Sequence, residues 1–485
     1  MNEAIRDLEP KTIWNNFADL NAVPRGSKKE EHVIAFMVAF GKKLGLETIV
    51  DKVQNVIIKK PATPGMENRK TVVLQSHLDM VHQKNADTNF DFDKDGIKML
   101  VDGDWVSADG TTLGADNGLG VATIMSILES KDIPHPALEA LFTIDEETGM
   151  TGAMGLEAGY LHGDILLNLD TEDDDEIDIG CAGGVDVTAK KKYEEIQTDT
   201  NCHAFKISLR GLKGGHSGMD IHLGLGNANK IMNRIFKATQ NIIRISSIQG
   251  GSLRNAIPRE SFATVVCDTK NAAKFIAKAE EIVSMIKSEF EIVEPNLNFT
   301  FEVVGCPLKV MSEKDQAQLI SAIDNAHNGV YKMSSEIPDL VEASNNIAKI
   351  NLENGNIQID CLTRSSVEES KTEVADLLKS TFEKEGFEVS FSGSYPGWKP
   401  NSNSPILKVM DQLYEDIFDK KPNVVACHAG LECGILGINY PEMDMISFGP
   451  TIKGAHSPDE KASISSTQKF WKYTQEILKN IPIKS

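Results

Sequence analysis

Apolar runs that end in polar or charged residues recur along the first part of the chain. Residues 71–76 carry no charge and are rich in aliphatic side chains, which predicts a buried strand, and His77 and Asp79 follow it. Where strand geometry continues, side chains two residues apart point to the same side. We therefore expect an imidazole and a carboxylate to leave the carboxyl end of one strand together, where open α/β sheets bind their ligands.

The same pattern returns at two further predicted strands. Residues 140–144 are followed by three adjacent carboxylates at positions 145–147, and residues 164–169 are followed by Asp170. Three adjacent carboxylates repel one another, which a solvated loop tolerates. A bound divalent cation would instead turn this repulsion into attraction.

Other predicted elements add one more carboxylate and a second imidazole. A predicted helix at 118–128 begins just after Asp116, and a predicted strand at 445–448 leads into a glycine-rich loop that contains His456. Strands and helices that alternate in this way predict an α/β layer. The earlier elements are a helical stretch and two short strands, expected at 11–47, 48–50 and 55–58.

Asp116 also has a role that needs no metal, because aspartate is a good N-cap for a helix. Taken alone, the cap is the better interpretation of this residue. However, independent solvated loops explain poorly why three strand ends and one helix start all present histidine or carboxylate. The coincidence favours a metal site.

The character of the chain changes near residue 184 and changes back near Pro400. The α/β pattern resumes after the second point, and the stretch 301–394 again shows strand, helix, strand. A chain of 485 residues is too long for one ordinary core, so at least two domains are expected. The middle region could contain a doubled α+β unit.

Two residues of the middle region are candidates for contact with a substrate. His216 lies in the glycine-rich loop 211–218, which is not a P-loop because no Gly-Lys-Ser/Thr closes it. This histidine could donate a hydrogen bond to a reacting group or be a turn residue without function. Arg364 follows a strand predicted at 356–360 and could bind a carboxylate through two hydrogen bonds, or form a surface ion pair.

Composition narrows the classes of partner. The chain carries 50 Lys and Arg against 71 Asp and Glu, a net charge of −21, so nucleic acid is not an expected partner. No apolar run is long enough to cross a bilayer and no signal peptide is visible, so we expect a cytoplasmic protein without membrane contact. The 7 cysteines form no C-x-x-C pair, which predicts reduced thiols.

The motifs, taken in order, resemble those of the M20 family of metallopeptidases along essentially the whole chain. The motifs that carry this resemblance are His77-Leu-Asp79, Asp116-Asn117, Asp145-Glu-Glu147, Asp170 and His456. The Gly-Gly-His-Ser-Gly loop at 214–218 and the stretch 428–434 are most similar to the aminoacyl-histidine dipeptidase branch of that family.

The resemblance implies an α/β fold with two domains. A zinc-peptidase-like catalytic domain, with a mixed sheet flanked by helices, would be built from residues 1–184 and 397–485. An α+β lid domain at 185–396 would be inserted between these two parts. Because lids of this family can dimerise, a homodimer through the lid domain is expected.

The resemblance also implies two divalent metal ions, most readily zinc, with manganese or cobalt as substitutes. Asp116 would bridge the two ions. His77 and Asp170 would complete one ion, and Glu147 and His456 would complete the other. In the family, the peptide bond that follows the bridging aspartate is often cis.

Catalytic roles follow from the same resemblance. Glu146 would act as general base, and Asp79 would orient His77. His216 would stabilise the oxyanion once the lid closes and excludes water. Four further residues are expected to hold the substrate: Asn255, Arg364, His428 and Glu432.

We therefore expect a dipeptidase that hydrolyses short peptides, including Xaa-His dipeptides. The alternative is an M20-type amidohydrolase that acts on N-acyl or N-carbamoyl amino acids. The metal ligands would be identical, so only lid and pocket residues could discriminate between the two. A metal-binding protein without turnover has no need of Glu146. A serine or cysteine hydrolase is disfavoured because no G-x-S-x-G motif is present.

Overall fold

The computed structural model describes residues 2–335 and 337–484, which fold into two compact units. Unit 1 comprises Met1–Gly180, Trp398–Ala426 and Leu431–Ser485. Unit 2 comprises Cys181–Gly397 and Cys427–Gly430. Residues 181–184, 397 and 427–430, which the sequence assigns to the first domain, belong to unit 2.

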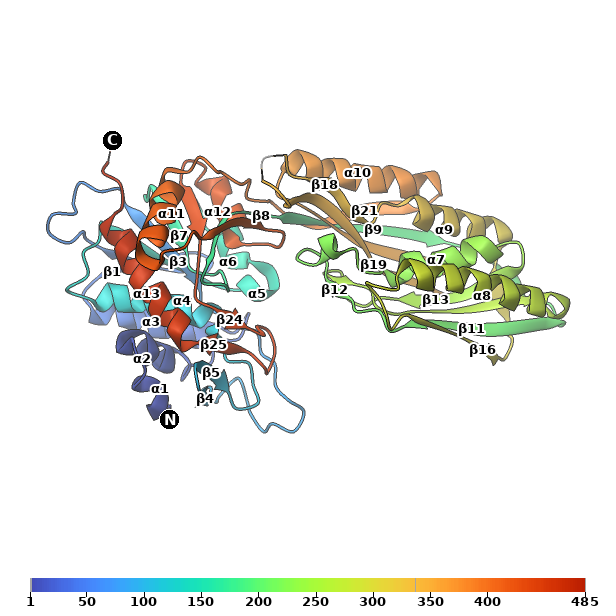
Figure 1. Cartoon of the computed structure of the whole chain (residues 1–485), viewed down its shortest axis with the longest axis horizontal. Coiled ribbons are helices and arrows are strands. Elements are labelled where there is room, and N and C mark those ends of the chain that lie inside the picture. Colours follow the sequence, from blue (N-terminus) through green and yellow to red (C-terminus); the bar gives the residue numbers. More distant parts are fainter. Residues whose placement is uncertain (1, 336, 485) are drawn as a thin grey trace. The chain divides into compact units, whose positions relative to one another are not determined.

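The central sheet of unit 1 is mixed. Its strands are β1 (Glu47–Val50), β2 (Val56–Lys60), β3 (Val72–His77), β6 (Leu138–Thr143), β7 (Ile165–Asn168), β8 (Glu176–Cys181), β22 (Asn423–Cys427) and β23 (Asp444–Ser447). They follow the order β1-β2-β6-β3-β7-β23-β8-β22, in which β6, β3, β7 and β23 run parallel. Figure 1 labels β1, β3, β7 and β8 of this sheet. Every residue of β3 is buried, so both faces of this central strand are covered.

Unit 1 contains several helices, of which α3, α4 and α11 pack on this sheet, and α4 brings one site residue to its edge. The helices are α1 (Glu3–Arg6), α2 (Lys11–Leu20), α3 (Glu31–Lys43), α4 (Ala115–Glu129), α5 (Glu146–Gly149), α6 (Thr151–Gly155), α11 (Pro405–Phe418), α12 (Glu432–Asn439) and α13 (Ile464–Lys479). The α4 helix is apolar around most of its circumference and packs against both α2 and β3. Its first turn carries Asp116.

The helical stretch expected at 11–47 is two helices separated by residues 21–30. Pro24 lies in this segment, and the residue before a proline is disfavoured in helical conformation. The break has a function in the fold, because the segment supplies Arg25, Ser27 and Glu30 to the edge of the sheet described below.

A second, smaller sheet of unit 1 joins two loops of the candidate site. Its strands are β4 (Met99–Asp102), β5 (Trp105–Ala108), β24 (Ile452–Lys453) and β25 (Lys461–Ser463). The order is β24-β25-β5-β4, with β25 paired antiparallel to β5. The loop between β24 and β25 contains His456, and the loop after β5 leads to Asp116. The small sheet thus connects the segments that carry these two residues.

Unit 2 is built on one antiparallel sheet with a duplicated order of elements. Its first half contains β11 (Cys202–Arg210), α7 (Ala228–Thr239), β13 (Ile243–Gly250), β15 (Ser261–Asp268), α8 (Ala272–Glu289) and β16 (Asn298–Val304). Its second half contains β9 (Gly183–Lys192), α9 (Glu313–Asn325), β19 (Val341–Glu353), β20 (Asn356–Ser365), α10 (Glu368–Lys384) and β21 (Glu388–Tyr395). The sheet order is β16-β11-β15-β13-β19-β20-β9-β21, so the second half repeats the order of the first in reverse and meets it at β13 and β19.

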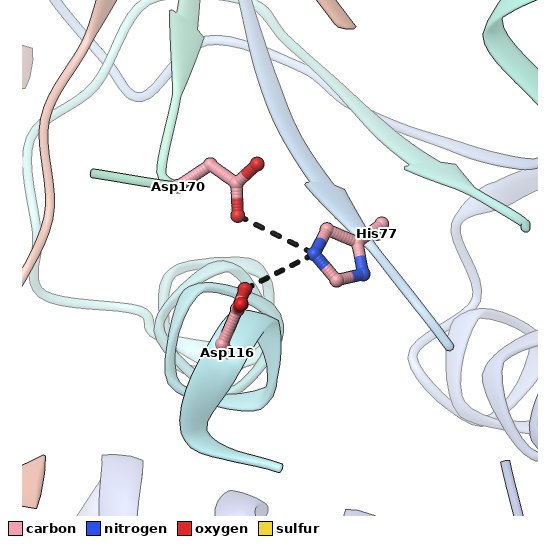
Figure 2. Close-up of side chains that lie close together, drawn as sticks. All are labelled: His77, Asp116 and Asp170. Carbon is pink, nitrogen blue, oxygen red and sulfur yellow. Dashed lines mark hydrogen bonds and ion pairs between the residues drawn. The ribbon is translucent and has the colours of Figure 1, made fainter. Parts of the chain in front are cut away.

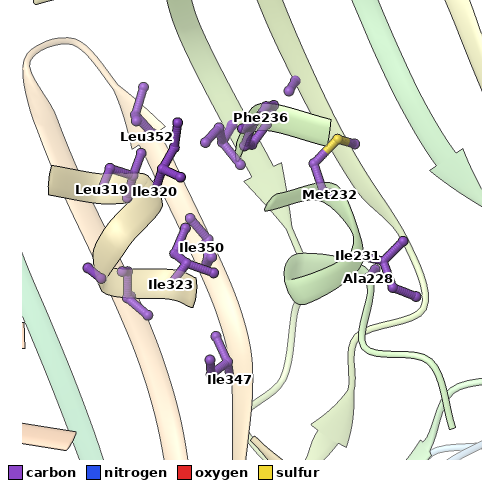
Figure 3. Packing of buried hydrophobic residues seen from close by; sticks show 14 of the residues in the cluster. Ala228, Ile231, Met232, Phe236, Leu319, Ile320, Ile323, Ile347, Ile350 and Leu352 are labelled. Carbon is purple, nitrogen blue, oxygen red and sulfur yellow. The ribbon is translucent and has the colours of Figure 1, made fainter. Parts of the chain in front are cut away.

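The core of unit 2 lies between this sheet and its helices. Figure 3 shows side chains of α7 and α9 packed with those of β19, including Phe236, Ile320 and Ile350. Smaller elements complete the unit: β10 (Glu195–Gln197), β12 (Gly215–His216), β14 (Ala256–Ile257), β17 (Lys309–Met311) and β18 (Gly329–Met333). Pairing of β12 with β14 fixes the loop that contains His216.

One pair of cysteines differs from the expectation of reduced thiols. Cys202 in β11 and Cys306 beyond β16 form a disulfide, with Cα atoms 6.5 Å apart. The register of these strands pairs Ala204 with Val304, and two more residues along each strand bring the cysteines opposite each other. The pairing depends on which strands are neighbours, which the sequence does not reveal. In the described part of the chain, no helix combines the length and the apolarity that crossing a bilayer requires.

Candidate metal centre

The carboxyl ends of three parallel strands carry most of the predicted ligands. His77 is the last residue of β3, and Asp170 lies two residues beyond the end of β7. β6 ends at Thr143, and the short helix α5 that follows begins with Glu146 and Glu147. Because β6, β3 and β7 are adjacent and parallel, these side chains meet at one edge of the sheet.

His77, Asp116 and Asp170 form a first group (Figure 2). Nε2 of His77 lies 3.2 Å from Oδ1 of Asp116 and 3.4 Å from Oδ1 of Asp170. The side chain of Asn117 donates a hydrogen bond to Asp170, and the peptide bond between Asp116 and Asn117 is cis. Asp116 and Asn117 have non-helical backbone angles within α4, and the carboxylate of Asp116 faces the imidazole.

A second group shares Asp116 with the first. Nε2 of His456 lies 3.2 Å from Oδ2 of Asp116 and 3.0 Å from Oε2 of Glu147. The other oxygen of Glu147, Oε1, is buried and has no hydrogen-bond partner among the described residues. The two oxygens of Asp116 therefore face different histidines, one in each group.

The donor atoms of these groups fit divalent metal ions. Within each of the two groups, one donor atom per residue can be chosen so that all lie within 4.8 Å of one another. The same holds for a third, overlapping set of His77, Glu146 and Glu147. Imidazole nitrogen and carboxylate oxygen are ligands that zinc takes in proteins. A buried carboxylate oxygen without a partner, such as Oε1 of Glu147, is costly unless a cation or a water molecule pairs with it.

The two histidines are strongly basic in this environment. Burial alone would lower the pKa of His77, but the carboxylates of Asp170 and Asp116 raise this pKa well above its usual value. Hydrogen bonds to Asp116 and Glu147 raise the pKa of His456 to about 11. Because a metal ligand must be the neutral imidazole, metal binding at these residues has to release protons.

Glu146 lies beside the first of these groups. Its Oε2 lies 4.0 Å from Nε2 of His77. Burial raises the pKa of Glu146 well above its usual value; the charge of His77 opposes this rise, and the carboxylates of Asp170 and Glu147 add to it. A carboxylate with a raised pKa is a stronger base than a solvated one.

Asp79 is fully buried and holds two parts of the site together. Its Oδ1 lies 3.4 Å from Nδ1 of His77, and its Oδ1 also accepts a 3.1 Å hydrogen bond from the backbone N–H of Glu146. Its Oδ2 accepts hydrogen bonds from the backbone N–H of Glu147 at 3.3 Å and the hydroxyl of Ser27 at 2.8 Å. The carboxylate of Asp79 thus links Nδ1 of His77 to the first turn of α5.

The segment 21–30 supports the site in a way that the sequence did not reveal. Arg25 is fully buried, and burial lowers the pKa of its guanidinium to about 10. Its Nη1 donates a 3.2 Å hydrogen bond to the backbone oxygen of Asp79. The carboxylate of Glu30 accepts a 3.0 Å hydrogen bond from the backbone N–H of Asp145. The proline and glycine that interrupt the helical pattern were the only local signal for this segment.

Glu172 is a further acidic residue near the centre that the sequence analysis did not select. Burial raises the pKa of Glu172 to about 8, and the nearby carboxylate of Asp116 adds to this rise. It follows Asp170 by two residues, the same spacing that joins His77 to Asp79. The spacing of two residues could have identified Glu172 from the sequence.

In unit 2, His216 and Arg364 lie together with Ser217 and Tyr395. Arg364 donates from Nη1 to the Tyr395 hydroxyl at 3.0 Å and from Nε to Ser217 Oγ at 3.4 Å, and its Nη2 lies 3.4 Å from Nε2 of His216. The side chain of Arg364 is only 5% exposed, so it does not form a surface ion pair. Asn255 is exposed, and its backbone oxygen accepts a 2.8 Å hydrogen bond from the N–H of Ser217.

Two residues expected to hold a substrate are buried in this structure. Nε2 of His428, in unit 2, lies 2.8 Å from the hydroxyl of Ser344, and burial lowers the pKa of this histidine to about 3. Oε2 of Glu432, in unit 1, accepts hydrogen bonds from Gln75 and Thr143, both at 2.6 Å. Glu432 is fully buried, and burial raises its pKa to about 8. In this structure, both side chains therefore have hydrogen-bond partners within their own unit.

This fold and the shared carboxylate between two histidines agree with a family of known metallopeptidases. The chain belongs to the peptidase family M20/M25/M40, whose family model matches residues 73–480. The prediction of the family, and of an α/β fold with a mixed sheet and a further α+β unit, is therefore confirmed.

Two relatives match over the whole length. The cytosol non-specific dipeptidase of Escherichia coli (strain K12) is 42% identical over 482 residues, which cover 99% of each chain. The crystal structure of aminoacylhistidine dipeptidase from Vibrio alginolyticus is 44% identical and covers 100% of each chain, with a TM-score of 0.91. A tripeptidase from Staphylococcus aureus, 17% identical with a TM-score of 0.56, covers 98% of this chain and 99% of its own and shares the fold.

Proposed function

We propose that this chain is a dinuclear metal-dependent dipeptidase that hydrolyses dipeptides, including Xaa-His. The observation that carries this proposal is the position of Asp116, whose two carboxylate oxygens each lie 3.2 Å from a different histidine. The substrate class is supported by two relatives named as dipeptidases, which are 42% and 44% identical over essentially the whole chain.

We propose that the two groups each hold one ion and share Asp116. His77 and Asp170 complete the first set of ligands, and Glu147 and His456 complete the second. Zinc is the ion that these donors suit best, with manganese or cobalt as substitutes. Bound there, two divalent ions would lower the pKa of a water molecule and polarise the carbonyl group of the scissile bond.

Glu146 is the proposed general base. It takes a proton from the attacking water and passes the proton to the leaving amine. Its raised pKa supports this role, because a more basic carboxylate accepts a proton more readily. Asp79 keeps His77 and Glu146 in place, because it orients the imidazole of His77 and binds the backbone N–H of Glu146.

The cluster in unit 2 is proposed to bind the substrate. The guanidinium of Arg364 pairs with the carboxylate of the dipeptide, a match that favours two parallel hydrogen bonds. His216 stabilises the oxyanion once the lid closes and excludes water. Asn255 is exposed beside this loop and provides a further polar contact. The burial of Arg364 supports its part, because its hydrogen bonds to Ser217 and Tyr395 fix the orientation of the guanidinium.

The second candidate function is that of an M20-type amidohydrolase for N-acyl or N-carbamoyl amino acids. The same metal ligands would serve both reactions, so the choice rests on the substrate. The dipeptidase is favoured by the two full-length relatives. The proposal further includes a cytoplasmic location, in line with the name of the Escherichia coli relative, and a homodimer formed through unit 2.

The experiment that tests this function compares Ala-His hydrolysis by the wild type and Glu146→Ala. Both proteins are stripped with a chelator and reloaded with zinc. We expect metal-dependent turnover by the wild type and a loss of at least 100-fold in kcat for the variant, with zinc binding retained. Glu157→Ala is the matched control, because Glu157 forms only an exposed ion pair with Lys52.

Each outcome of this experiment distinguishes between the candidate functions or tests the assignment of the general base. No turnover of dipeptides by zinc-loaded wild type, together with turnover of N-acetyl or N-carbamoyl amino acids, would replace the dipeptidase by the amidohydrolase. Equal activity of Glu146→Ala and the wild type would show that another group takes the proton. Zinc binding without turnover on either substrate class would indicate a metal-binding protein that is not an enzyme.

A further inference from the structure

The carboxylate of Glu460 accepts hydrogen bonds from four consecutive backbone N–H groups. Oε2 accepts from Leu113 at 2.8 Å and from Gly114 at 2.9 Å. Oε1 accepts from Ala115 at 2.8 Å and from Asp116 at 3.2 Å. Glu460 is 2% exposed, so its carboxylate is shielded from solvent and is bound by these N–H groups.

Three of these N–H groups lie at the N-cap Gly114 and in the first two positions of α4, where a helix leaves its first N–H groups without partners in the helix, and Leu113 directly precedes the N-cap. An aspartate that caps a helix accepts hydrogen bonds from N–H groups two or three residues further along. The carboxylate of Asp116 accepts none of the four N–H groups that bind Glu460, and its two oxygens face His77 and His456.

Glu460 is itself fixed to the segment that carries His456. It lies four residues further along the chain, and its backbone N–H donates a 3.0 Å hydrogen bond to the oxygen of Ser457. The next residue begins β25, which pairs with β5, the strand that leads to Asp116. The side chain of Glu460 thus connects the segment that carries Asp116 with the segment that carries His456.

The same loop is held from its other side by a buried positive charge. Nη2 of Arg25 donates to the backbone oxygen of Gly114, and Nη1 donates to the backbone oxygens of Leu78 and Asp79. Arg25 therefore binds one carbonyl group of the loop, that of Gly114, and links it to the segment after β3, while Glu460 binds the N–H groups of the loop. A carboxylate that accepts several N–H groups in a buried site forms the strong, charge-assisted kind of hydrogen bond.

We propose that Glu460 is a positioning residue of the metal centre. It fixes the backbone of Asp116 and leaves that carboxylate free to bridge two ions, and it thereby sets the affinity of the site for metal. This inference rests on the proposed function, because it requires that the centre binds metal. The competing role is that of a helix cap that stabilises the fold and leaves the metal affinity unchanged.

The test measures the zinc dissociation constant of Glu460→Gln by competition with a chromophoric chelator. Glutamine keeps the shape and one acceptor oxygen, but it turns an amide N–H2 group toward two backbone N–H groups. We expect zinc affinity to fall at least tenfold and kcat to recover in excess zinc, with KM for Ala-His unchanged. Asp459→Asn is the matched control, because it removes the same charge from the exposed neighbouring residue, and we expect wild-type affinity.

The outcomes separate this inference from the proposed function. Wild type that binds no zinc would contradict the proposed function. Wild type and Glu460→Gln that bind zinc equally well would contradict the positioning role alone. If metal-free Glu460→Gln is unfolded by circular dichroism, Glu460→Asp is measured in the same way, since it keeps the charge and shortens the side chain. If neither variant folds without metal, Glu460 supports the fold and the positioning role is rejected.

Discussion

The carboxylate of Asp79 accepts a 3.1 Å hydrogen bond from the backbone N–H of Glu146, the residue proposed as general base. Asp79 and Glu460 therefore act in the same manner at two places. Each is a buried carboxylate that accepts backbone N–H groups at the start of a helix, where the next side chains are proposed to bind metal or protons. In both places a carboxylate distant in sequence binds the backbone N–H groups, so the local carboxylates remain available for chemistry.

The first prediction concerns Asp79→Asn. An amide at this position loses one acceptor oxygen and presents a donor to a backbone N–H group or to Nδ1 of His77. We expect zinc affinity or kcat on Ala-His to fall by about 10–100-fold. Chelator competition and steady-state kinetics on the same preparation measure the two quantities. Ser27→Ala removes only one hydroxyl donor to Asp79 and should change both by less than about fivefold.

The second prediction concerns protons released by metal binding. The pKa of His456 is raised to about 11, so this ring is protonated at pH 7.5 in the metal-free protein, and the pKa of His77 also lies well above its usual value. Zinc requires neutral imidazoles. We expect about two protons or more to be released per protein, measured by calorimetric titration in two buffers of different ionisation enthalpy. His456→Ala should release about one proton fewer, and an unchanged number would contradict the assignment of this ligand.

The third prediction concerns the pH dependence of stability at Glu432. Burial raises its pKa from 4.5 to about 8, so between these values the folded protein holds a proton that the unfolded chain has lost. The contribution of Glu432 to the free energy of unfolding therefore falls as pH rises from 4.5 to 8. Above pH 8 the folded protein bears the full cost of burying the ionised carboxylate.

Glu432→Gln should remove this cost and keep the acceptor oxygen for Gln75 and Thr143. In metal-free protein, we expect stabilisation on the order of 3 kcal/mol at pH 9 and a small effect at pH 5. Urea unfolding at the two pH values measures the difference. A variant whose stability differs from wild type by the same amount at both pH values would show that Glu432 is ionised in the folded protein.

The fourth prediction concerns the disulfide of unit 2. Thiol titration in denaturant should count the five free cysteines before reduction and all 7 after it. Cys202 and Cys306 are separated by 104 residues, so the bond closes a long loop, and its loss should cost about 2–4 kcal/mol of stability. Cys202→Ser should show this loss with zinc binding intact, since the ligands belong to unit 1. Seven free thiols in the oxidised protein would contradict the bond.

The fifth prediction concerns the proposed homodimer. The sheet of unit 2 ends at β16 and β21, and Val303 on β16 is 66% exposed. Lysine on an edge strand opposes pairing with another chain. If the dimer forms through β16, light scattering should give twice 53.1 kDa for the wild type and 53.1 kDa for Val303→Lys. Ile438→Lys, at an exposed position of unit 1, should remain dimeric, and a monomeric wild type would contradict the dimer.

The sequence could predict those site residues that stand at the ends of elements. His77 and Asp170 follow apolar runs that form buried parallel strands, and the ends of such strands converge in any sheet of this kind. Arg25 and Glu460 could not be found in this way. Their partners are backbone groups far along the chain, and a backbone N–H or C=O group leaves no trace in the sequence.

The other differences between the expectations from the sequence and the structure also arise from long-range contacts. The helical spacing at 11–47 continues across residues 21–30, but the contacts of Arg25 and Glu30 with the sheet edge require an irregular backbone there. The disulfide depends on the neighbourhood of β11 and β16, which local patterns do not determine. The burial of Glu432 likewise depends on Gln75 and Thr143, which lie on two other strands.

The duplicated order of elements in unit 2 indicates the order in which its strands pair during folding. The whole first half lies, along the chain, between β9 and the other strands of the second half. Gly183 of β9 pairs with Ser365 of β20, whereas the strands of the first half pair across much shorter loops. Because closing a long loop costs more conformational entropy, distant pairings form late. We therefore expect β9, the strand through which the chain enters unit 2, to be the last strand inserted during folding, between β20 and β21.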